Sequence, residues 1–330
     1  MNGSSPLQIG VLGAGHLGRI HMQQWLQVEG VQVVGFHDPH PEKCAAIEKE
    51  FGLRPLGSVD AVLEACQALD IVTPTTTHYD LARRAMELGR DLFIEKPVTN
   101  TVLEGQALLA LAQEHGRIVQ VGHVERFNPA FTAARPALKD PMFIETHRLA
   151  QFDPRGTDVS VVLDLMIHDI DIVLSVVDSP VADIHASGVA VVSDTPDIAN
   201  ARISFANGCV ANLTASRISL KKMRKSRFFQ RDAYISVDML EKKTEIVRMH
   251  AMEGAVDPFA IVLDLGAKGK RAIAFDRPDV QPVNAIREEL QAFAHAVRAR
   301  TVPPVPLTDG LRALEVAHRV LEQLGGDKPK

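Results

Sequence analysis

A glycine-rich turn separates the first apolar run of the chain from a helical pattern. Gly13, Gly15 and Gly18 follow the run Leu7–Leu12, and the helical pattern begins at His16. In this context the first glycine permits a tight turn, the second lets the backbone approach a pyrophosphate, and the third allows close helix–strand packing. The unpaired N–H groups of a helix start suit a diphosphate. We therefore expect a dinucleotide at Gly13, Ala14, Gly15, His16, Leu17 and Gly18.

Asp38 bears on which dinucleotide binds. It follows the second apolar run, Val31–Phe36, where an acidic residue would bind the ribose hydroxyls of the adenosine. A carboxylate there would repel a 2′-phosphate, and Pro39 stands where an arginine would be needed to hold that phosphate. The sequence therefore predicts NAD rather than NADP. The alternative is that Asp38 is only a capping or turn residue before Pro41.

A lysine follows the apolar run Asp91–Ile94. Glu95, Lys96 and Pro97 stand at the carboxyl end of that run, which is the sheet edge where open α/β proteins bind ligands. A lysine at this edge can stabilise an alkoxide-like oxygen by its charge. The alternative is a solvated lysine at the end of a strand.

Asp164 and His168 are four residues apart in a helical pattern at Ser160–Val177. Side chains at this spacing are neighbours on one helix face. The carboxylate would orient the imidazole and raise its basicity, which suits a general base that removes a hydroxyl proton. One alternative is a capping aspartate beside a structural histidine. A metal site is another, but too few ligands accompany the pair to favour it.

The first half of the chain must position the turn, Asp38 and the lysine. We assign residues 1–125 to a nucleotide-binding domain because strand-like runs alternate with helical patterns, which predicts a parallel, doubly wound α/β sheet. The expected strands are Leu7–Leu12, Val31–Phe36, Leu69–Val72, Asp91–Ile94 and Ile118–Val121. The expected helices are His16–Val28, Pro41–Phe51, His78–Leu88 and Thr101–His115.

The rhythm changes in residues 126–330, which we assign to a second, substrate-binding domain. The helix Ser160–Val177 is followed by consecutive strand-like runs, so we predict an α+β domain with a largely antiparallel sheet. Asn207 and Gly208 predict a hairpin with a type I′ turn. The expected strands are Asp183–Val192, Ile198–Ala206, Cys209–Ile218, Ser226–Gln230, Tyr234–Met239 and Thr244–His250. Two apolar stripes predict closing helices, at Ile286, Leu290, Phe293 and Val297 and at Leu311, Leu314, Ala317, Leu321 and Leu324.

Composition excludes several classes of protein. The 330 residues are 46% hydrophobic with a formal net charge of −5, which excludes global disorder and gives no reason to expect nucleic-acid or membrane binding. No run of about 18 apolar residues could span a bilayer, and the start lacks the features of a signal peptide. The scattered cysteines Cys44, Cys66 and Cys209 suit a reducing cytoplasm. We expect a cytoplasmic enzyme.

The turn GAGHLG, the triplet EKP and the segment DLMIHDID together resemble the glucose–fructose oxidoreductase / inositol dehydrogenase (Gfo/Idh/MocA) family. This resemblance implies a Rossmann domain, a C-terminal domain with an open sheet, a nicotinamide cofactor, and homo-oligomers, dimeric or tetrameric, that form through the sheet. It makes Lys96 the catalytic lysine, in contact with cofactor and substrate, and Asp164 and His168 the acid–base pair at the substrate. The further cofactor contacts that it implies are Thr73, Pro74, Thr75, His78, Glu95 and His123.

Two segments bear on the substrate. The segment around Arg126 and Asn128 resembles that of UDP-N-acetylglucosamine 3-dehydrogenases within this family, which makes both residues candidate substrate contacts. Asn128 could instead cap a helix that begins at Pro129. Between Lys221 and Arg231 there are six cations and no acid, and Arg224 among them could hold a diphosphate. Lysines that protect a solvated edge strand explain the cluster equally well.

These observations favour NAD-dependent oxidation of a sugar hydroxyl, most specifically the 3-hydroxyl of a UDP-N-acetylglucosamine-type sugar. The lysine of one half and the histidine of the other must then act on one reacting carbon. An inositol, free-sugar or other polyol dehydrogenase is the nearer alternative, and it would not need the cationic segment. A non-catalytic dinucleotide-sensing protein is the other alternative, and it would not need Lys96, Asp164 and His168 together.

Overall fold

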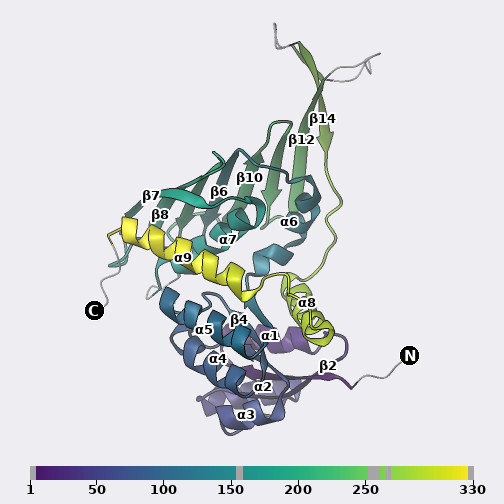
Figure 1. Cartoon of the computed structure of the whole chain (residues 1–330), viewed down its shortest axis with the longest axis vertical. Coiled ribbons are helices and arrows are strands. Elements are labelled where there is room, and N and C mark those ends of the chain that lie inside the picture. Colours follow the sequence, from purple (N-terminus) through teal and green to yellow (C-terminus); the bar gives the residue numbers. More distant parts are fainter. Residues whose placement is uncertain (1–4, 154–158, 252–260, 265, 267–268, 326–330) are drawn as a thin grey trace. The chain divides into compact units, whose positions relative to one another are not determined.

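The computed structural model describes residues 5–153, 159–251, 261–264, 266 and 269–325 (Figure 1). Contacts divide the chain into two compact units. Residues 1–127 and 284–315 form the first unit, and residues 128–283 and 316–330 form the second. The predicted boundary at 125/126 lies two residues before 127/128, where the chain first passes from one unit to the other. Residues 284–315 were assigned to the second domain, but their contacts belong to the first unit.

Parallel strands form the sheet of the first unit, in the order β2-β1-β3-β4-β5 among the described residues. The strands are β1 (Leu7–Leu12), β2 (Val31–His37), β3 (Ala68–Ile71), β4 (Asp91–Glu95) and β5 (Val119–Gly122). The helices are α1 (His16–Trp25), α2 (Pro41–Phe51), α3 (Val59–Ala65), α4 (His78–Glu87), α5 (Val102–Glu114) and α8 (Ala285–Ala299), with the 3₁₀ turns η1 (Thr75–Thr77) and η2 (Val124–Phe127). The predicted parallel α/β sheet is confirmed, and α3 is the helix of this sheet that the pattern missed.

Helix α8 belongs to the first unit because its apolar stripe packs against that unit's core. The Phe293 ring lies edge-on to Trp25 and to Phe93, with centroids 6.3 and 5.9 Å away. Leu290 and Phe293 are fully buried in the same cluster. The Gln120 side chain in β5 also donates to the Glu289 carbonyl at 2.9 Å. Sequence periodicity predicted the helix and its buried face, but a stripe does not state which sheet it covers.

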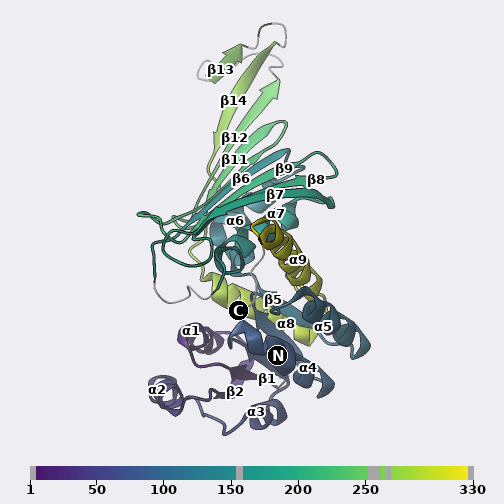
Figure 2. The same ribbon diagram turned by 90° about the vertical axis from the view of Figure 1, so that its left-hand side faces the viewer.

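The described part of the second unit contains a mixed sheet in the order β13-β14-β12-β11-β10-β6-β9-β8-β7 (Figure 2). Its strands are β6 (Phe143–Leu149), β7 (Val181–Val189), β8 (Ile198–Phe205), β9 (Val210–Ser216), β10 (Met223–Phe229), β11 (Ala233–Asp238), β12 (Lys243–Ala251), β13 (Ile261–Asp264) and β14 (Lys270–Asp276). β6 pairs with β9 in parallel, and the other pairings are antiparallel. The predicted α+β class with a largely antiparallel sheet is confirmed.

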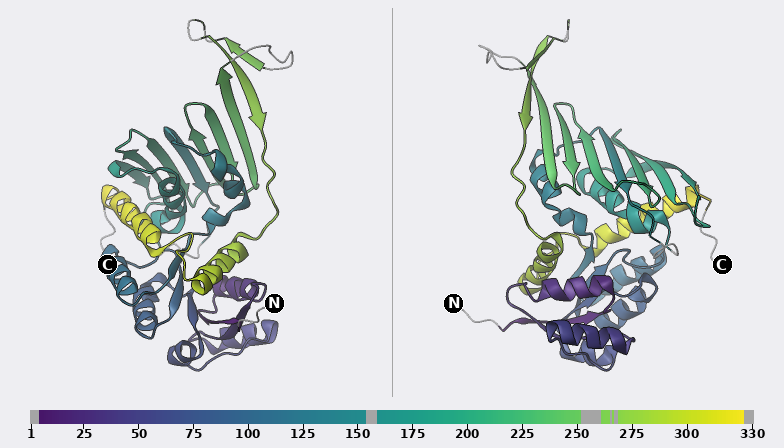
Figure 3. Two further views of the ribbon diagram at one scale, coloured as in Figure 1. Left: turned by 45° about the vertical axis from the view of Figure 1, so that its right-hand side comes forward. Right: turned by 180° about the vertical axis from the view of Figure 1, so that it is seen from behind.

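Helices cover one face of this sheet. α6 (Pro129–Ala134) packs on β11 and β12, and α7 (Ile167–Val176) packs on β6 and β9 (Figure 3). A 3₁₀ turn, η3 (Arg135–Ala137), follows α6, and a π-helical turn, η4 (Val162–Met166), precedes α7. α9 (Leu307–Gln323) begins in the first unit and ends in the second. On the other sheet face the alternate residues of β8 and β9 are half-buried or exposed, so these two strands are accessible there, and we call this side the open face of the sheet.

The hairpin between β8 and β9 is present, but its turn is not type I′. Gly208 has a φ of +87°, and Asn207 is absent from the described residues with positive φ. The Gly208 N–H donates to the Phe205 carbonyl and the Phe205 N–H donates to the Cys209 carbonyl, both at 2.9 Å. This is a three-residue loop in which only the last residue needs the left-handed region. The Asn207 side chain stabilises the loop by accepting from the Cys209 N–H at 3.0 Å.

The three cysteines are free thiols. Burial raises the pKa of both Cys66 and Cys209 to about 11, so both remain protonated and unreactive at neutral pH. Among the described residues, no helix combines the length and the apolar character that a membrane crossing requires.

Candidate active site

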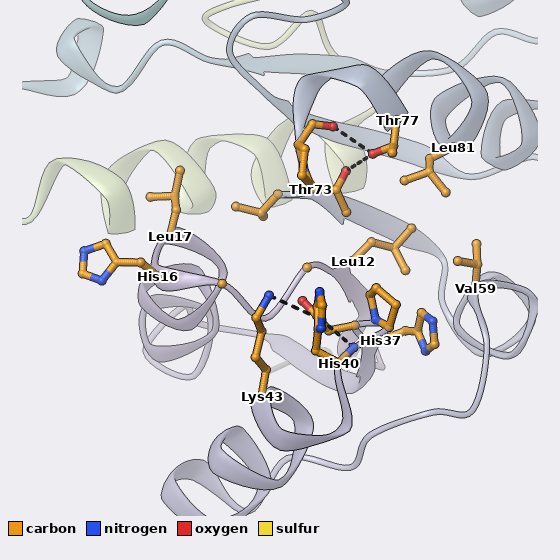
Figure 4. Close-up of a pocket in the computed structure, with 16 residues that line it drawn as sticks. Leu12, His16, Leu17, His37, His40, Lys43, Val59, Thr73, Thr77 and Leu81 are labelled. Carbon is orange, nitrogen blue, oxygen red and sulfur yellow. Dashed lines mark hydrogen bonds and ion pairs between the residues drawn. The ribbon is translucent and has the colours of Figure 1, made fainter. Parts of the chain in front are cut away.

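Loops after the first three parallel strands enclose a cavity of about 660 Å³ in the first unit. The glycine turn follows β1, Asp38 and Lys43 follow β2, and Thr73 and Thr77 follow β3 (Figure 4). The cavity therefore lies at the carboxyl ends of the strands, where the strand order changes direction. The predicted cofactor residues that line it are Gly13, Gly15, His16, Leu17, Asp38, Thr73 and Pro74.

The glycine turn fits a pyrophosphate. Gly13 has a φ of +103°, and a Cβ there would lie 2.6 Å from the Val72 carbonyl oxygen. A Cβ on Gly18 would overlap the Gly13 carbonyl, whereas a Cβ on Gly15 would meet nothing within 4 Å. Gly15 is the N-cap of α1 and no side chain caps this helix end. The first N–H groups of α1 therefore border open space that suits a diphosphate, while Gly18 serves packing.

The Asp38 carboxylate organises the turn as well as facing the cavity. Its Oδ2 accepts from the Ala14 N–H at 2.8 Å, and its Oδ1 accepts from the His40 N–H at 2.9 Å. The ammonium of Lys43 lies 3.8 Å from Oδ1. Ala14 thus contributes through its backbone to the geometry of the turn. The capping role that the sequence left open and a role at the ribose are compatible, since each carboxylate oxygen can accept more than one hydrogen bond.

His78 connects the loops that follow β3 and β4. Its side chain is 1% exposed, and its ring nitrogens lie 2.9 Å from the carbonyl oxygens of Pro97 and Thr73. Burial lowers the pKa of the His78 ring, so a neutral ring donates to one of these carbonyls at a time. Thr75 lies in η1 and is half-buried. The structure thus places neither residue among those that line the cavity.

Lys96 immediately follows β4 and is half-buried. Its backbone N–H donates to Glu95 Oε2 at 3.1 Å, and Glu95 Oε1 lies 3.2 Å from His21 Nε2. Both oxygens of Glu95 therefore have partners within the protein. Gly122 faces Glu95 across the β4–β5 pairing, and a Cβ on Gly122 would lie 2.7 Å from Glu95 Oε1. The next residue, His123, is buried.

In the second unit, Asp164 and His168 lie on consecutive helical segments. Asp164 is in the π-helical turn η4, His168 is in the first turn of α7, and both are half-buried. The predicted continuous α-helix is therefore interrupted at Asp164. Such π-helical turns are rare in proteins overall, but those that occur often lie at functional sites.

A buried ion pair fixes the start of α7 to the sheet. The Arg148 guanidinium in β6 donates to both carboxylate oxygens of Asp169, at 3.0 and 2.9 Å. Arg224 of β10 is directly opposite Arg148 in the strand pairing, and residues opposite each other in a sheet point to the same face. Arg224 therefore lies on the face that carries α7.

The cationic segment is divided between two faces of the sheet. Ser226 and Phe228 are buried, and because they occupy alternate positions of β10 they point to the same face as Arg224. Lys225 and Arg227 alternate with them and therefore point to the open face, where Arg227 donates to Glu145 at 2.8 Å. The segment is therefore not one patch, because Arg224 points to the opposite face from Lys225 and Arg227.

Arg126 and Asn128 are engaged within separate units. The Arg126 guanidinium donates to Asp309 at 3.1 Å in the first unit. Asn128 is the N-cap of α6, with Oδ1 accepting from the Ala130 N–H and Nδ2 donating to the Met239 carbonyl, both at 3.1 Å. The Met239 N–H in turn donates to the Arg224 carbonyl at 2.8 Å.

Comparison with known proteins identifies the family. A profile of the Gfo/Idh/MocA oxidoreductase family, with an NAD-binding Rossmann fold, matches residues 7–123, and a profile of the family's C-terminal domain matches residues 118–232. The chain is 37% identical over 315 residues to the UDP-N-acetylglucosamine 3-dehydrogenase of Acidithiobacillus ferrooxidans, covering 95% of this chain and 96% of that protein. The chain belongs to the Gfo/Idh/MocA family. It is thus a member of a family of NAD(P)-dependent dehydrogenases that act on CH–OH groups.

Solved structures agree with this membership. The chain matches the structure of the same Acidithiobacillus ferrooxidans enzyme with a TM-score of 0.87 at 35% identity, over 96% of this chain and 97% of that chain. A putative myo-inositol dehydrogenase from Sinorhizobium meliloti shares the fold, with a TM-score of 0.78 at 21% identity over 97% of both chains. By sequence, the scyllo-inositol 2-dehydrogenase (NAD(+)) of Bacillus subtilis is 30% identical over 230 residues, which cover 63% of this chain and 67% of that protein.

Sequence reasoning missed several residues that line this cavity. Lys43 reaches Asp38 from the first turn of α2, and Thr77 reaches the cavity from η1, where its hydroxyl lies 2.7 Å from that of Thr73. Val59 and Leu81 add apolar walls. For Lys43 the sequence offered one signal, its position: a helix that begins at Pro41 places Lys43 close to Asp38.

Asp169→Asn is expected to destabilise the protein by about 3–5 kcal/mol, because it leaves the buried Arg148 guanidinium without its charge partner. Side-chain exposures of 5% and 4% show that water cannot replace this interaction. The matched control is Glu245→Gln, which removes an ion pair to Arg277 that is 80% and 53% exposed and should change stability by less than about 1 kcal/mol. Calorimetric unfolding compares the two, and equal effects would contradict the structural role of the buried pair.

Proposed function

We propose that the protein is an NAD-dependent dehydrogenase that oxidises the 3-hydroxyl of a UDP-N-acetylglucosamine-type nucleotide sugar to a ketone. The observation that carries this proposal is the 37% identity, across 95% of the chain, to a protein named UDP-N-acetylglucosamine 3-dehydrogenase. The position of Arg224 adds support, because it stands beside Arg148 on the sheet face that carries α7. A guanidinium there suits the diphosphate of a nucleotide sugar, which a free sugar or inositol lacks.

Residues of both units have roles in this reaction. His168 would remove the hydroxyl proton, with Asp164 stabilising the imidazolium that forms. Lys96 would stabilise the negative charge that develops on the same oxygen. The nicotinamide, when bound, supplies the hydride acceptor. The glycine turn and Asp38 would hold the dinucleotide, and Arg224, Arg126 and Asn128 are the candidate substrate contacts.

The proposed cofactor is NAD, and Asp38→Ser tests this preference. The Asp38 carboxylate lines the cavity where the adenosine ribose would lie, and it would repel a 2′-phosphate. Without it, the Lys43 ammonium, which also lines the cavity, would attract that phosphate. We expect the NAD-to-NADP ratio of kcat/KM to fall by at least about tenfold, in line with the loss of one charge–charge repulsion. Fluorescence titration with NADH and NADPH gives a binding readout, and an unchanged ratio would contradict this role.

The substrate is tested by incubating the protein with NAD and a panel of alcohols, and by following NADH fluorescence. The panel contains UDP-N-acetylglucosamine, UDP-glucose, free N-acetylglucosamine and myo-inositol. We expect NADH with UDP-N-acetylglucosamine and little with the free sugar. Turnover of inositol alone would instead favour the polyol dehydrogenase, and no turnover despite NADH binding would favour the sensing protein.

Arg224→Ala tests the nucleotide-sugar interpretation directly. Loss of a charge-assisted contact to a phosphate should raise KM for UDP-N-acetylglucosamine by at least about tenfold, with KM for NAD unchanged. Arg227→Ala is the matched control, since it removes a cation of the same strand that points to the opposite face. Equal effects of the two variants would show that the diphosphate is not held at Arg224.

We also propose that the protein is a homo-oligomer, a dimer or tetramer, that assembles through the open face of the second unit's sheet. The alternate residues of β8 and β9 on this face are half-buried or exposed, so a second copy could cover them. Sedimentation velocity measures the assembly, and a monomer at micromolar concentration would contradict the proposal.

A further inference from the structure

A histidine in the interior of the first unit is held between two carboxylates. His21 in α1 is 1% exposed, and its Nδ1 lies 3.0 Å from Asp70 Oδ2 in β3. Its Nε2 lies 3.2 Å from Glu95 Oε1 at the end of β4. Asp70 and Glu95 are themselves buried. Two carboxylates cannot both accept from a neutral imidazole, because that ring carries a single N–H.

The surroundings of His21 stabilise the doubly protonated ring. Burial alone would lower the pKa of His21, but the charges and hydrogen bonds of Asp70 and Glu95 outweigh it and raise the pKa to about 10. Burial would likewise raise the pKa of Glu95, but His21, the Lys96 ammonium and the Lys96 N–H together hold it below its usual value. Two aromatic side chains complete these contacts: Trp25 donates to Asp70 at 2.7 Å, and Phe93 lies edge-on to the His21 ring.

The same carboxylate that pairs with His21 holds the backbone of Lys96. Glu95 Oε2 accepts from the Lys96 N–H at 3.1 Å while Oε1 faces the imidazole. Gly122 provides the space for this carboxylate, since a Cβ there would lie 2.7 Å from Oε1. The following residue, Pro97, is held from the other side by His78 at 2.9 Å.

His21 also ties the lysine to the dinucleotide turn. It lies on α1, whose amino end is Gly15 and whose first residue is His16. Asp70 is on β3, and the loop that follows β3 forms another wall of the cavity. The His21 ring therefore connects α1, β3 and β4, and neither His21 nor its two carboxylate partners are among the residues that line the cavity.

We propose that His21 is a positioning residue for Lys96: a buried imidazolium that keeps Glu95 ionised and thereby fixes the backbone of the lysine relative to the glycine turn. This inference rests on the proposed role of Lys96 in catalysis. Loss of the ring's charge would remove the largest of the contributions that keep the buried Glu95 ionised. Glu95 would then take up a proton or turn away, and in either case its bond to the Lys96 N–H would be lost or weakened.

The charge of His21 can be tested on the unmodified protein, without any substrate. Long-range ¹H–¹⁵N correlation spectra distinguish imidazolium from neutral imidazole, and the His21 signal is assigned by its loss in His21→Gln. We expect both ring nitrogens to carry protons at pH 8 and the ring to lose a proton only near pH 10, in line with its pKa of about 10. A neutral ring at pH 8 would overturn the proposal.

The positioning role is tested by the kinetics of His21→Gln. Misplacement of a catalytic group by about 1 Å can cost about 100-fold in rate, so we expect kcat to fall by at least about tenfold while KM for NAD stays within about twofold. Glu95→Gln, which removes the carboxylate through which His21 acts, should lower kcat similarly and also leave KM for NAD within about twofold.

Trp25→Phe is the matched control. It removes a hydrogen bond to the same Asp70 and disturbs the same core, but it leaves the contact between His21 and Glu95. We expect it to lower the thermal midpoint while kcat stays within about twofold of the parental value. Equal values of kcat in His21→Gln and Trp25→Phe would overturn the positioning role. Turnover retained in Lys96→Met would instead refute the role of the lysine, so the two failures are distinguishable.

Discussion

Lys96→Met is expected to reduce kcat by about 10³-fold while the protein still binds NADH. Removal of one group that stabilises a developing oxyanion costs about 10²–10³ in rate, and a full ammonium charge is at the upper end of that range. Lys96 stands directly after β4, at the carboxyl edge of the parallel sheet. Methionine keeps the length of the aliphatic stem, so the substitution removes the charge with little change in packing.

Lys49→Met is the matched control for this substitution. Lys49 is exposed on α2, and its replacement should leave kcat and NADH affinity unchanged within about twofold. Fluorescence titration with NADH confirms that each variant binds the dinucleotide, and the rate of NADH formation gives kcat. Near-parental turnover in Lys96→Met would remove the lysine from the mechanism.

Local signals predicted the dinucleotide-binding part of the fold well. The strand Leu7–Leu12 and the helix Pro41–Phe51 have the bounds expected of them. Their causes are local: an apolar run of strand length in one case, and in the other a proline at the first turn and Gly52 in the left-handed region at the end. Where adjacent residues determine how a helix or strand begins and ends, the sequence is sufficient to predict its bounds.

The second unit was harder to predict because its buried positions include polar residues. β6, in the middle of the sheet, buries Thr146 and Arg148 at alternate positions, so its pattern does not read as apolar alternation. Arg148 is buried because Asp169 supplies a partner for it from a distant part of the chain. No local pattern contains that information.

The residues of the candidate site also differ in whether local sequence signals could predict them. The glycine turn and Asp38 were predicted because phosphate binding requires a particular local backbone. His21 escaped prediction because its partners come from β3 and β4, and a histidine within an amphipathic helix carries no sign of them. Glu95 and His78 were expected at the cofactor, but their hydrogen bonds connect protein segments that only the folded sheet brings together.

His168→Asn is the second substitution with a large expected effect. Removal of a general base lowers kcat by about 10²–10⁴-fold, and asparagine keeps a polar side chain on the first turn of α7. The parental kcat should fall at low pH as the base becomes protonated, and this limb should be absent from the variant. Asp164→Asn should lower kcat less, because it removes the charge that stabilises the imidazolium while the base remains.

The chain offers a matched control in a second histidine–aspartate pair. His185 Nε2 lies 2.7 Å from Asp183 on β7, and the two side chains are 74% and 59% exposed. Because this pair belongs to the same unit, His185→Asn and Asp183→Asn should leave kcat and its pH profile unchanged. If they reproduce the losses at His168 and Asp164, those losses reflect the fold of the second unit and not proton transfer.

The double variant Lys96→Met/His168→Asn tests whether the two groups serve one reacting centre. Residues that act as a unit show strongly non-additive effects, so that the loss of both costs little more than the larger single loss. Groups that act in separate steps or at separate sites would multiply their losses instead. We expect the double variant to lie within about tenfold of the slower single variant. If the loss in kcat of the double variant equals the two single losses multiplied together, joint action on one carbon is refuted, even if each residue alone proves essential.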